Sequence, residues 1–258
     1  MKLSAVVHNI EKRIPRNWAE DWDNTGLAFG TPASDIKEIA LALDVTEQTV
    51  SDASKFSQLL VTHHPIIFRA MKSIVTDKPA ARAIANAIKH DIALYSLHTN
   101  WDSSPEGVNV ILADLLGLRD AEPLEEPKYK NGAFGIGAFG SFDTPLIMTE
   151  CIQLLKERWR VSDIAAFGDR KRVIRKIAIG GGSCGDMWQG ALDKGADLFI
   201  TSDISYHHRQ DALSMGLNLI ETDHGETERL SLPALKKIIE KETSLPVTII
   251  EEEPVKRI

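Results

Sequence analysis

Histidines gather at points of the sequence where predicted strands end. His63 and His64 stand directly before Pro65, after a short apolar run. Adjacent side chains on a regular strand point to opposite faces, but at a strand terminus before proline two imidazoles can splay around two metal ions. Alternatively, the dipeptide is a pair of partly exposed loop histidines. Taken alone, the pair leaves a metal site and a plain loop both open.

Two further segments combine a histidine with a carboxylate four residues later. Asp102 follows His98 just past a predicted strand, where its two oxygens could bridge two divalent ions or cap a helix. His224 and Glu228 share one face of a helical turn, as a metal clamp or as a surface ion pair. Together these segments supply four imidazoles and two carboxylates without a thiolate. Such a set suits two Zn, Mn, Fe, Ni or Co ions about 3.5–4 Å apart, which activate water.

Two weaker candidates lie in the second half of the chain. Gly180, Gly181 and Gly182 join a predicted strand to a helix, and their N–H groups could form an anion nest or only a tight turn. The run matches neither the Rossmann nor the Walker pattern. His207, beside His208, follows another predicted strand and could move protons or be an ordinary surface residue.

The elements that must position these residues alternate between strand and helix patterns. Strands are predicted at residues 38–45, 58–62, 92–97, 133–140, 173–179, 196–201, 217–221 and 246–251. Helices are predicted at residues 47–56, 78–90, 108–116, 145–159, 186–194, 206–215 and 226–241, the last with Pro233 in its first turns. This order predicts an α/β fold with mostly parallel sheets. In such sheets ligands bind beyond the carboxyl ends of the strands, where the histidines fall.

A stretch rich in proline and charge, residues 121–132, predicts a linker between two α/β domains, residues 1–126 and 127–258. The 258 residues are 43% hydrophobic and 26% charged, which excludes collagen, a disordered chain and a coiled-coil rod. The net charge of −7 disfavours a nucleic-acid partner. No apolar run has the length of a membrane span or a signal peptide. Two distant cysteines suit a reducing compartment, so we expect a cytoplasmic protein.

Several motifs in combination resemble the Nif-three-like family, whose members are also named dinuclear-metal-centre hexameric proteins or GTP cyclohydrolase type 2 homologues. The resemblance runs nearly end to end. It rests on Trp22-Asp23-Asn24-Thr25-Gly26-Leu27, Val61–Pro65, His98–Asp102, Gly107-Val108-Asn109, the Gly180–Gly182 turn, Asp197–Asp203 and the His224-x₃-Glu228 pair. The chain departs from the family at Ser202, because the family usually has glycine at this position. Glycine adopts a positive φ at a lower cost than serine does.

The resemblance implies a Nif-three-like fold of two interlinked α/β domains with a dinuclear metal site at their interface. His64 and Asp102 would hold one ion, and His63 and His224 would hold the other. Glu228 would bridge both ions. The resemblance also implies a homohexameric ring.

The resemblance also implies that His98 orients the metal ligands through hydrogen bonds. His207 aligns with a histidine at the family's cleft. We assign proton transfer to His98 or His207. We therefore expect a metal-dependent hydrolase that acts on a small nucleotide-like or heterocyclic substrate. The alternative is a non-enzymatic oligomeric protein that stores, delivers or senses metal.

Overall fold

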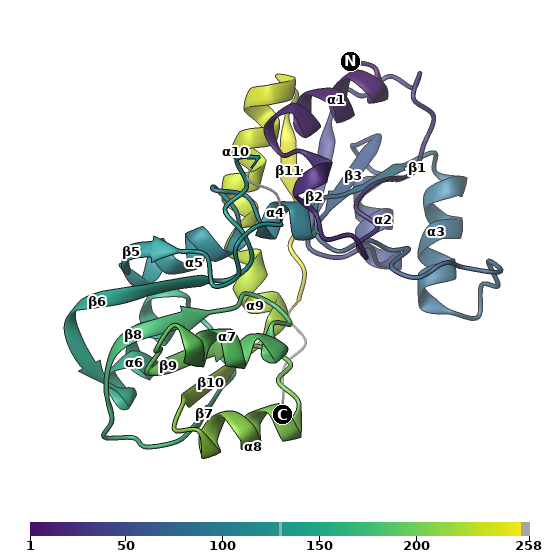
Figure 1. Cartoon of the computed structure of the whole chain (residues 1–258). Coiled ribbons are helices and arrows are strands. Elements are labelled where there is room, and N and C mark those ends of the chain that lie inside the picture. Colours follow the sequence, from purple (N-terminus) through teal and green to yellow (C-terminus); the bar gives the residue numbers. More distant parts are fainter. Residues whose placement is uncertain (129–130, 254–258) are drawn as a thin grey trace. The chain divides into compact units, whose positions relative to one another are not determined.

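The computed structural model describes residues 1–128 and 131–253 and divides the chain into two compact units (Figure 1). The first unit consists of residues 1–101 together with residues 232–253. The second unit consists of residues 102–231. The chain therefore leaves the first unit, builds the second and returns.

The first unit is built on a five-stranded sheet of order β1-β4-β3-β2-β11. Its strands are β1 (Gly26–Phe29), β2 (Ile39–Ala42), β3 (Leu59–Thr62), β4 (Ala93–Ser96) and β11 (Val247–Ile249). All neighbours are parallel except β1 and β4. The register pairs Ala42 with Thr62 and Thr62 with Ser96, so the carboxyl ends of β2, β3 and β4 meet at one edge of the sheet.

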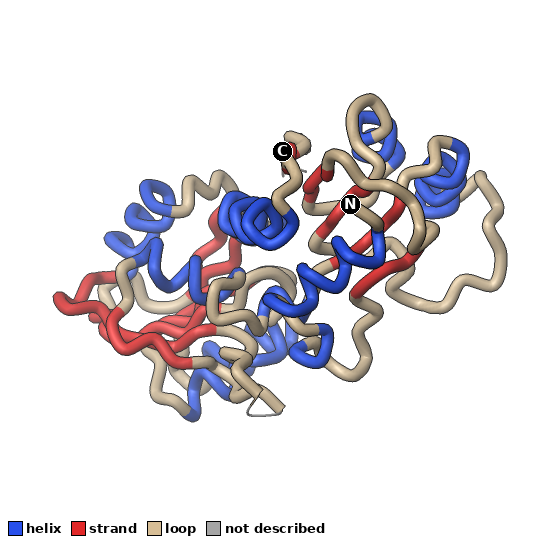
Figure 2. Tube along the Cα trace, turned by 90° about the horizontal axis from the view of Figure 1, so that it is seen from above, coloured by secondary structure: helices blue, strands red, loops and turns tan. Residues whose placement is uncertain are grey.

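Helices cover both faces of this sheet, as Figure 2 shows with helices in blue and strands in red. They are α1 (Leu3–Arg13), α2 (Glu47–Ala53), α3 (Pro79–Lys89) and α10 (Leu232–Thr243), with a single 3-10 turn at Arg16–Trp18. The three central strands β2, β3 and β4 are buried on both faces, which explains their continuous apolar runs. Ala40 and Ala42 pack with Val50 of α2 and Ala87 of α3, while α1 packs on α10.

The second unit is built on a six-stranded sheet of order β5-β6-β8-β9-β10-β7. Its strands are β5 (Arg119–Glu122), β6 (Ala138–Ile147), β7 (Ile164–Phe167), β8 (Val173–Ile179), β9 (Leu198–Thr201) and β10 (Asn218–Thr222). The three central strands β8, β9 and β10 are parallel, and the pairs toward both edges are antiparallel. The α/β prediction is therefore confirmed, with parallel strands at the centre of each sheet.

The second sheet also carries helices on both faces. They are α5 (Val108–Leu116), α6 (Met148–Arg158), α7 (Trp188–Asp193), α8 (Tyr206–Ser214) and α9 (His224–Arg229), with a 3-10 turn at Gly185–Met187. Trp188 and Ala212 pack with Phe199 on the α7/α8 side. On the other side the Trp159 indole N–H donates to the Leu112 carbonyl and joins α6 to α5. The short helix α4 (Thr99–Asp102) carries the chain from one unit to the other.

The division into units differs from the predicted boundary after residue 126. Part of the predicted linker is the edge strand β5, in which Glu122 pairs with Phe139 of β6. Tyr129 and Lys130 of that linker lie outside the described residues. The C-terminal helix and strand belong to the first unit because β11 pairs with β2.

The predicted long helix over residues 226–241 is two helices. Helix α9 ends near Leu230, where the Ser231 N–H and hydroxyl both donate to the Glu228 carbonyl. Pro233 is then the second residue of α10, a position where a missing N–H costs no helical hydrogen bond. In the described part of the chain, no helix has both the length and the apolar character that a bilayer crossing requires.

Candidate metal centre

His63 and His64 continue the line of β3 beyond its last residue. Their N–H groups donate to the carbonyls of Ala42 and Leu43, so the backbone stays beside β2. The two ring centroids lie 4.9 Å apart and the rings are tilted by 48°. The pair is therefore a close cluster at a strand end, as the position before Pro65 predicts.

His98 joins this cluster from the end of β4. The register that aligns Thr62 with Ser96 brings His98 level with His64. The His98 ring centroid lies 5.2 Å from that of His63 and 5.7 Å from that of His64. One ligand atom from each of the three imidazoles lies within 4.8 Å of the others, close enough to share a metal ion. The first unit thus offers three imidazoles, one more than the two that we assigned as ligands.

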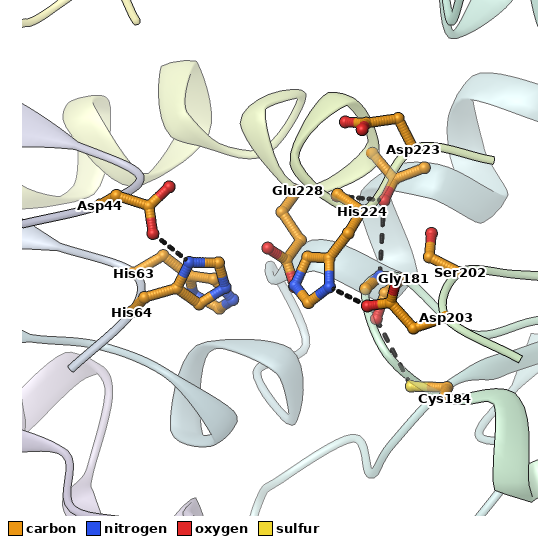
Figure 3. Close-up of polar contacts among 12 residues, drawn as sticks. Asp44, His63, His64, Gly181, Cys184, Ser202, Asp203, Asp223, His224 and Glu228 are labelled. Atoms are coloured by element: carbon orange, nitrogen blue, oxygen red, sulfur yellow. Dashed lines mark hydrogen bonds and ion pairs between the residues drawn. The ribbon is translucent and has the colours of Figure 1, made fainter. Parts of the chain in front are cut away.

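His224 and Glu228 form a second group, which belongs to the second unit. Both lie on α9, whose start is capped by the Asp223 carboxylate accepting from the Glu226 N–H. The helical turn brings His224 Nε2 to 3.0 Å from Glu228 Oε1, as the four-residue spacing predicts. The Glu228 side chain is 4% exposed. His224 points toward Asp203, which lies on the loop after β9 (Figure 3).

All four imidazoles place Nδ1 against an oxygen that can only accept a hydrogen bond. The partners are Leu97 O for His63 at 2.8 Å, Asp44 Oδ1 for His64 at 2.8 Å, Asp23 Oδ1 for His98 at 2.9 Å and Asp203 Oδ2 for His224 at 2.7 Å. The hydrogen therefore sits on Nδ1, and in each neutral ring the lone pair is on Nε2. This arrangement orients an imidazole and raises its basicity as a metal ligand.

The Asp23 carboxylate is the most enclosed of these acceptors. Burial pushes its pKa upward, but hydrogen bonds from the His98 ring and from the Thr99 hydroxyl and N–H outweigh burial and hold the pKa of Asp23 below its usual value. Asp23 is therefore ionised at neutral pH and fixes the ring of His98.

Residues 1–255 match the family described as Duf34/NIF3 (NGG1p interacting factor 3). The chain belongs to this family. A GTP cyclohydrolase 1 type 2 homolog of Clostridium perfringens is 39% identical over 242 residues, which cover 93% of this chain and 91% of that protein. NIF3-like protein 1 of Drosophila melanogaster is 31% identical over 263 residues, or 98% of this chain and 88% of that one. The Nif-three-like resemblance is thereby confirmed.

The fold is that of the Duf34/NIF3 family as well. A Bacillus cereus protein related to NIF3 has a crystal structure that superposes with a TM-score of 0.92. The superposition covers 100% of this chain and 99% of the other, at 21% sequence identity.

In this Duf34/NIF3 protein the remaining predicted site residues lie in the second unit. Asp102 is buried at the end of α4, and its carbonyl accepts from the Asn109 side chain. His207 is exposed on the first turn of α8, where its ring lies edge-on to Tyr206. The structure thus gives Asp102 a protected position and gives His207 a surface one.

The Gly180–Gly182 turn packs against the acidic side of α9. Its three N–H groups donate internally, to Ile200 O, to Asn109 Oδ1 and to Thr227 Oγ1. Gly182 has a φ of +71°, and a Cβ built there would lie 2.1 Å from Glu228 Oε1. The turn therefore makes room for the Glu228 carboxylate, and the anion nest stays a prediction.

Cys184 follows this turn, and its thiol donates to the Gly181 carbonyl. Burial of the thiol, together with the negative charges of Asp102 and Glu228, raises the pKa of Cys184 well above its usual value. A reactive thiolate is therefore absent from this position at neutral pH.

The sequence motifs do not include Asp44, and they include Asp23 and Asp203 without indicating a role for either. Strand register contains a signal for the first, since Ala42 pairs with Thr62 and Asp44 therefore lies level with His64. Asp203 adopts a φ of +53° two residues beyond β9, so the positive φ falls on an aspartate and not on Ser202.

Proposed function

We propose that this Duf34/NIF3 protein is a metal-dependent hydrolase that uses two divalent ions per chain. The observation that carries the proposal is the fixing of four imidazoles through Nδ1, three of them by carboxylates. Metal-binding histidines almost always donate their other ring N–H to a carboxylate, a backbone carbonyl or water, whereas histidines that serve only in packing need no such partner. The donor set of imidazole and carboxylate fits Zn, Mn, Fe, Ni or Co.

The assignment of ligands to ions follows the family pattern. In this assignment His64 and Asp102 hold one ion, His63 and His224 hold the other, and Glu228 bridges them. It requires the histidine cluster of the first unit to meet the α9 pair of the second, which is part of the proposal. It also leaves His98, the third imidazole of the cluster, available for proton transfer.

Two bound ions would supply a water with a pKa near 7 and a clamp for the attacked group. The protein's own part is to position and to move protons. His98 is held by Asp23, and its side chain is 15% exposed, so its Nε2 can take a proton from a reacting group while Asp23 stabilises the resulting imidazolium. Asp203 and Asp44 keep their imidazoles from rotating.

The substrate that we propose is small and nucleotide-like or heterocyclic. The names of relatives such as the Clostridium perfringens GTP cyclohydrolase 1 type 2 homolog make GTP one compound to test. We also propose that the chain assembles as a homohexameric ring, as the family resemblance implies, and that it works in the cytoplasm.

A non-enzymatic metal-storing or metal-sensing protein is the second candidate, and the position of His207 favours it. His207 is exposed, and its ring lies against the exposed ring of Tyr206. A histidine in this position is poorly placed to shuttle protons. In that case the metal ligands would be the same, but His98 would have no role in turnover.

Elemental analysis of untagged protein after reconstitution with each candidate metal tests the proposal. We expect about two ions per chain for the wild type and fewer for Asp102→Ala. His208→Ala, on the exposed turn of α8, is the matched control and should keep both ions. Native mass measured alongside should be six times that of one 28.5 kDa chain. Less than about half an ion per chain, unchanged in Asp102→Ala, would show that the ligand set is wrong.

Turnover separates the two candidate functions. A panel of GTP, other nucleotides and phosphodiesters is offered to the metal-loaded wild type and to His98→Gln. We expect hydrolysis of at least one compound by the wild type and a loss of about 100-fold or more in His98→Gln, with both ions retained. Two ions per chain without hydrolysis of any compound would favour storage or sensing.

A further inference from the structure

Two large aromatic side chains lie exposed beside the histidine cluster of the first unit. Trp22 is 59% exposed and Phe68 is 48% exposed. The ring centroids of Trp22 and Phe68 are 5.7 Å apart. The centroid of His98 lies 6.2 Å from that of Trp22 and 6.1 Å from that of Phe68. Exposure of a whole indole to water is unfavourable, and a protein that places one beside a candidate reaction centre gains little stability from it.

The three rings support one another. The interplanar angles are 67° between Trp22 and Phe68, 74° between Trp22 and His98 and 86° between Phe68 and His98. These are edge-to-face contacts, the favoured geometry of aromatic pairs. The rings are therefore held in defined positions while much of the surface of Trp22 and Phe68 stays open to solvent.

Polar contacts fix the two loops that carry these rings. The Asn24 amide donates to the Ile67 carbonyl at 2.6 Å and so ties the Trp22 turn to the segment of Phe68. On the other side of the turn, Asp23 accepts from His98 and from Thr99, and the Glu20 N–H donates to the Thr99 hydroxyl. Asp23 and Asn24 thus both contribute to the placement of Trp22 relative to His98.

We infer that Trp22 and Phe68 form a stacking platform that binds the planar ring of a heterocyclic substrate. The centroids of Trp22 and His98 are 6.2 Å apart, so a ring that stacks on Trp22 would lie in the neighbourhood of His98. Stacking on an aromatic side chain accepts any nucleobase, since every base has a π face. The inference rests on the proposed function, to which it adds the residues that recognise the planar ring of the substrate.

Binding of nucleoside monophosphates to the metal-loaded protein tests the platform. The probes are GMP and CMP, with ribose 5-phosphate as the probe that lacks a base, and the measurement is the dissociation constant by calorimetry. We expect GMP or CMP to bind about tenfold or more weakly to Trp22→Ala, and Phe68→Ala to weaken binding in the same direction. Trp22→Phe should restore most of the affinity, and ribose 5-phosphate should bind all variants equally.

Ile74→Ala is the matched control, because Ile74 is 52% exposed on the same connection between β3 and α3 but is aliphatic. It should bind GMP and CMP as the wild type does. If neither nucleotide binds the wild type at millimolar concentration, or if Trp22→Ala binds both as tightly as the wild type, the inference is wrong. A fall in native mass in Trp22→Ala and Ile74→Ala, with nucleotide binding intact, would instead assign the exposed side chains to a protein interface.

The platform and the proposed hydrolase can fail separately. Metal content near two ions per chain with nucleotide binding that does not depend on Trp22 would overturn the platform alone. Nucleotide binding that depends on Trp22 in protein that holds no metal would overturn the hydrolase and leave the platform standing. Circular dichroism of Trp22→Ala confirms that any loss of binding does not come from unfolding.

Discussion

Replacing Gly182 with alanine is expected to weaken metal binding far more than it destabilises the fold. The added Cβ would lie 2.1 Å from Glu228 Oε1 and 3.3 Å from His224 Nε2. The carboxylate would have to retreat by roughly 1 Å to reach ordinary contact distance. Metal ligands tolerate errors of about 0.2 Å, so we expect the affinity for the bound ions to fall about 100-fold.

Gly117 provides a matched control for the backbone. It has a φ of +72°, against +71° for Gly182, but a Cβ built there has no neighbour within 4 Å. An alanine in this left-handed conformation costs about 1–2 kcal/mol at either position. In a chain of this size that cost corresponds to a fall in Tm of roughly 2–8 °C. With the metal removed by a chelator, Gly117→Ala should lose this much stability, and Gly182→Ala should lose this much and in addition the cost of displacing the Glu228 carboxylate.

Calorimetric titration of the chelated proteins with Zn²⁺ or Mn²⁺ measures the difference. Gly117→Ala should bind the ions as the wild type does, and Gly182→Ala should bind them about 100-fold more weakly. Equal affinity in the two variants would refute the reasoning, because it would mean that the position of Glu228 next to the turn is irrelevant to the ions.

Three further predictions concern single side chains. Asp203→Ala removes the acceptor for His224 Nδ1 and should lower metal affinity about 10- to 100-fold in the same titration. Burial raises the pKa of Cys151 to about 12 and that of Cys184 well above its usual value, so neither thiol should react with Ellman's reagent at pH 8 until the protein is unfolded, when both should. Burial raises the pKa of Asp197, but hydrogen bonds from the Lys176 and Arg175 N–H groups and from Arg172 outweigh it and hold the pKa below its usual value. A lowered pKa stabilises the fold above the unfolded value near 4, and the effect is lost as pH falls through the lower pKa of the folded state, so Asp197→Asn should cost about 1 kcal/mol in urea unfolding at pH 7 and progressively less as the pH falls below 4.

Local sequence patterns predict the elements that are buried and regular. Helix α5 and strand β8 have the predicted bounds, because an apolar periodicity ends at Gly117 in one case and four of the seven residues from Val173 to Ile179 are β-branched in the other. The contact between His224 and Glu228 also follows from spacing alone, since a helical turn fixes it.

Pairing between distant segments is what the sequence does not reveal. Strand β5 has four exposed residues and is held by backbone hydrogen bonds to β6, so it carries no hydrophobic alternation. The carboxylates that orient the imidazoles are 20 residues from His64, 21 from His224 and 75 from His98. Each becomes a neighbour only when the strands have paired, and no spacing rule applies across such separations.

The return of residues 232–253 to the first unit has a consequence for synthesis on the ribosome. Residues 102–231 form a continuous segment and can fold as soon as they have emerged, whereas β2 lacks its outer neighbour β11 until Val247–Ile249 have also been made. Until then the nascent protein exposes one edge of its first sheet and the surface that α10 covers. The second unit is thus free to fold first, and the first unit closes around a partner strand that is made after the second unit.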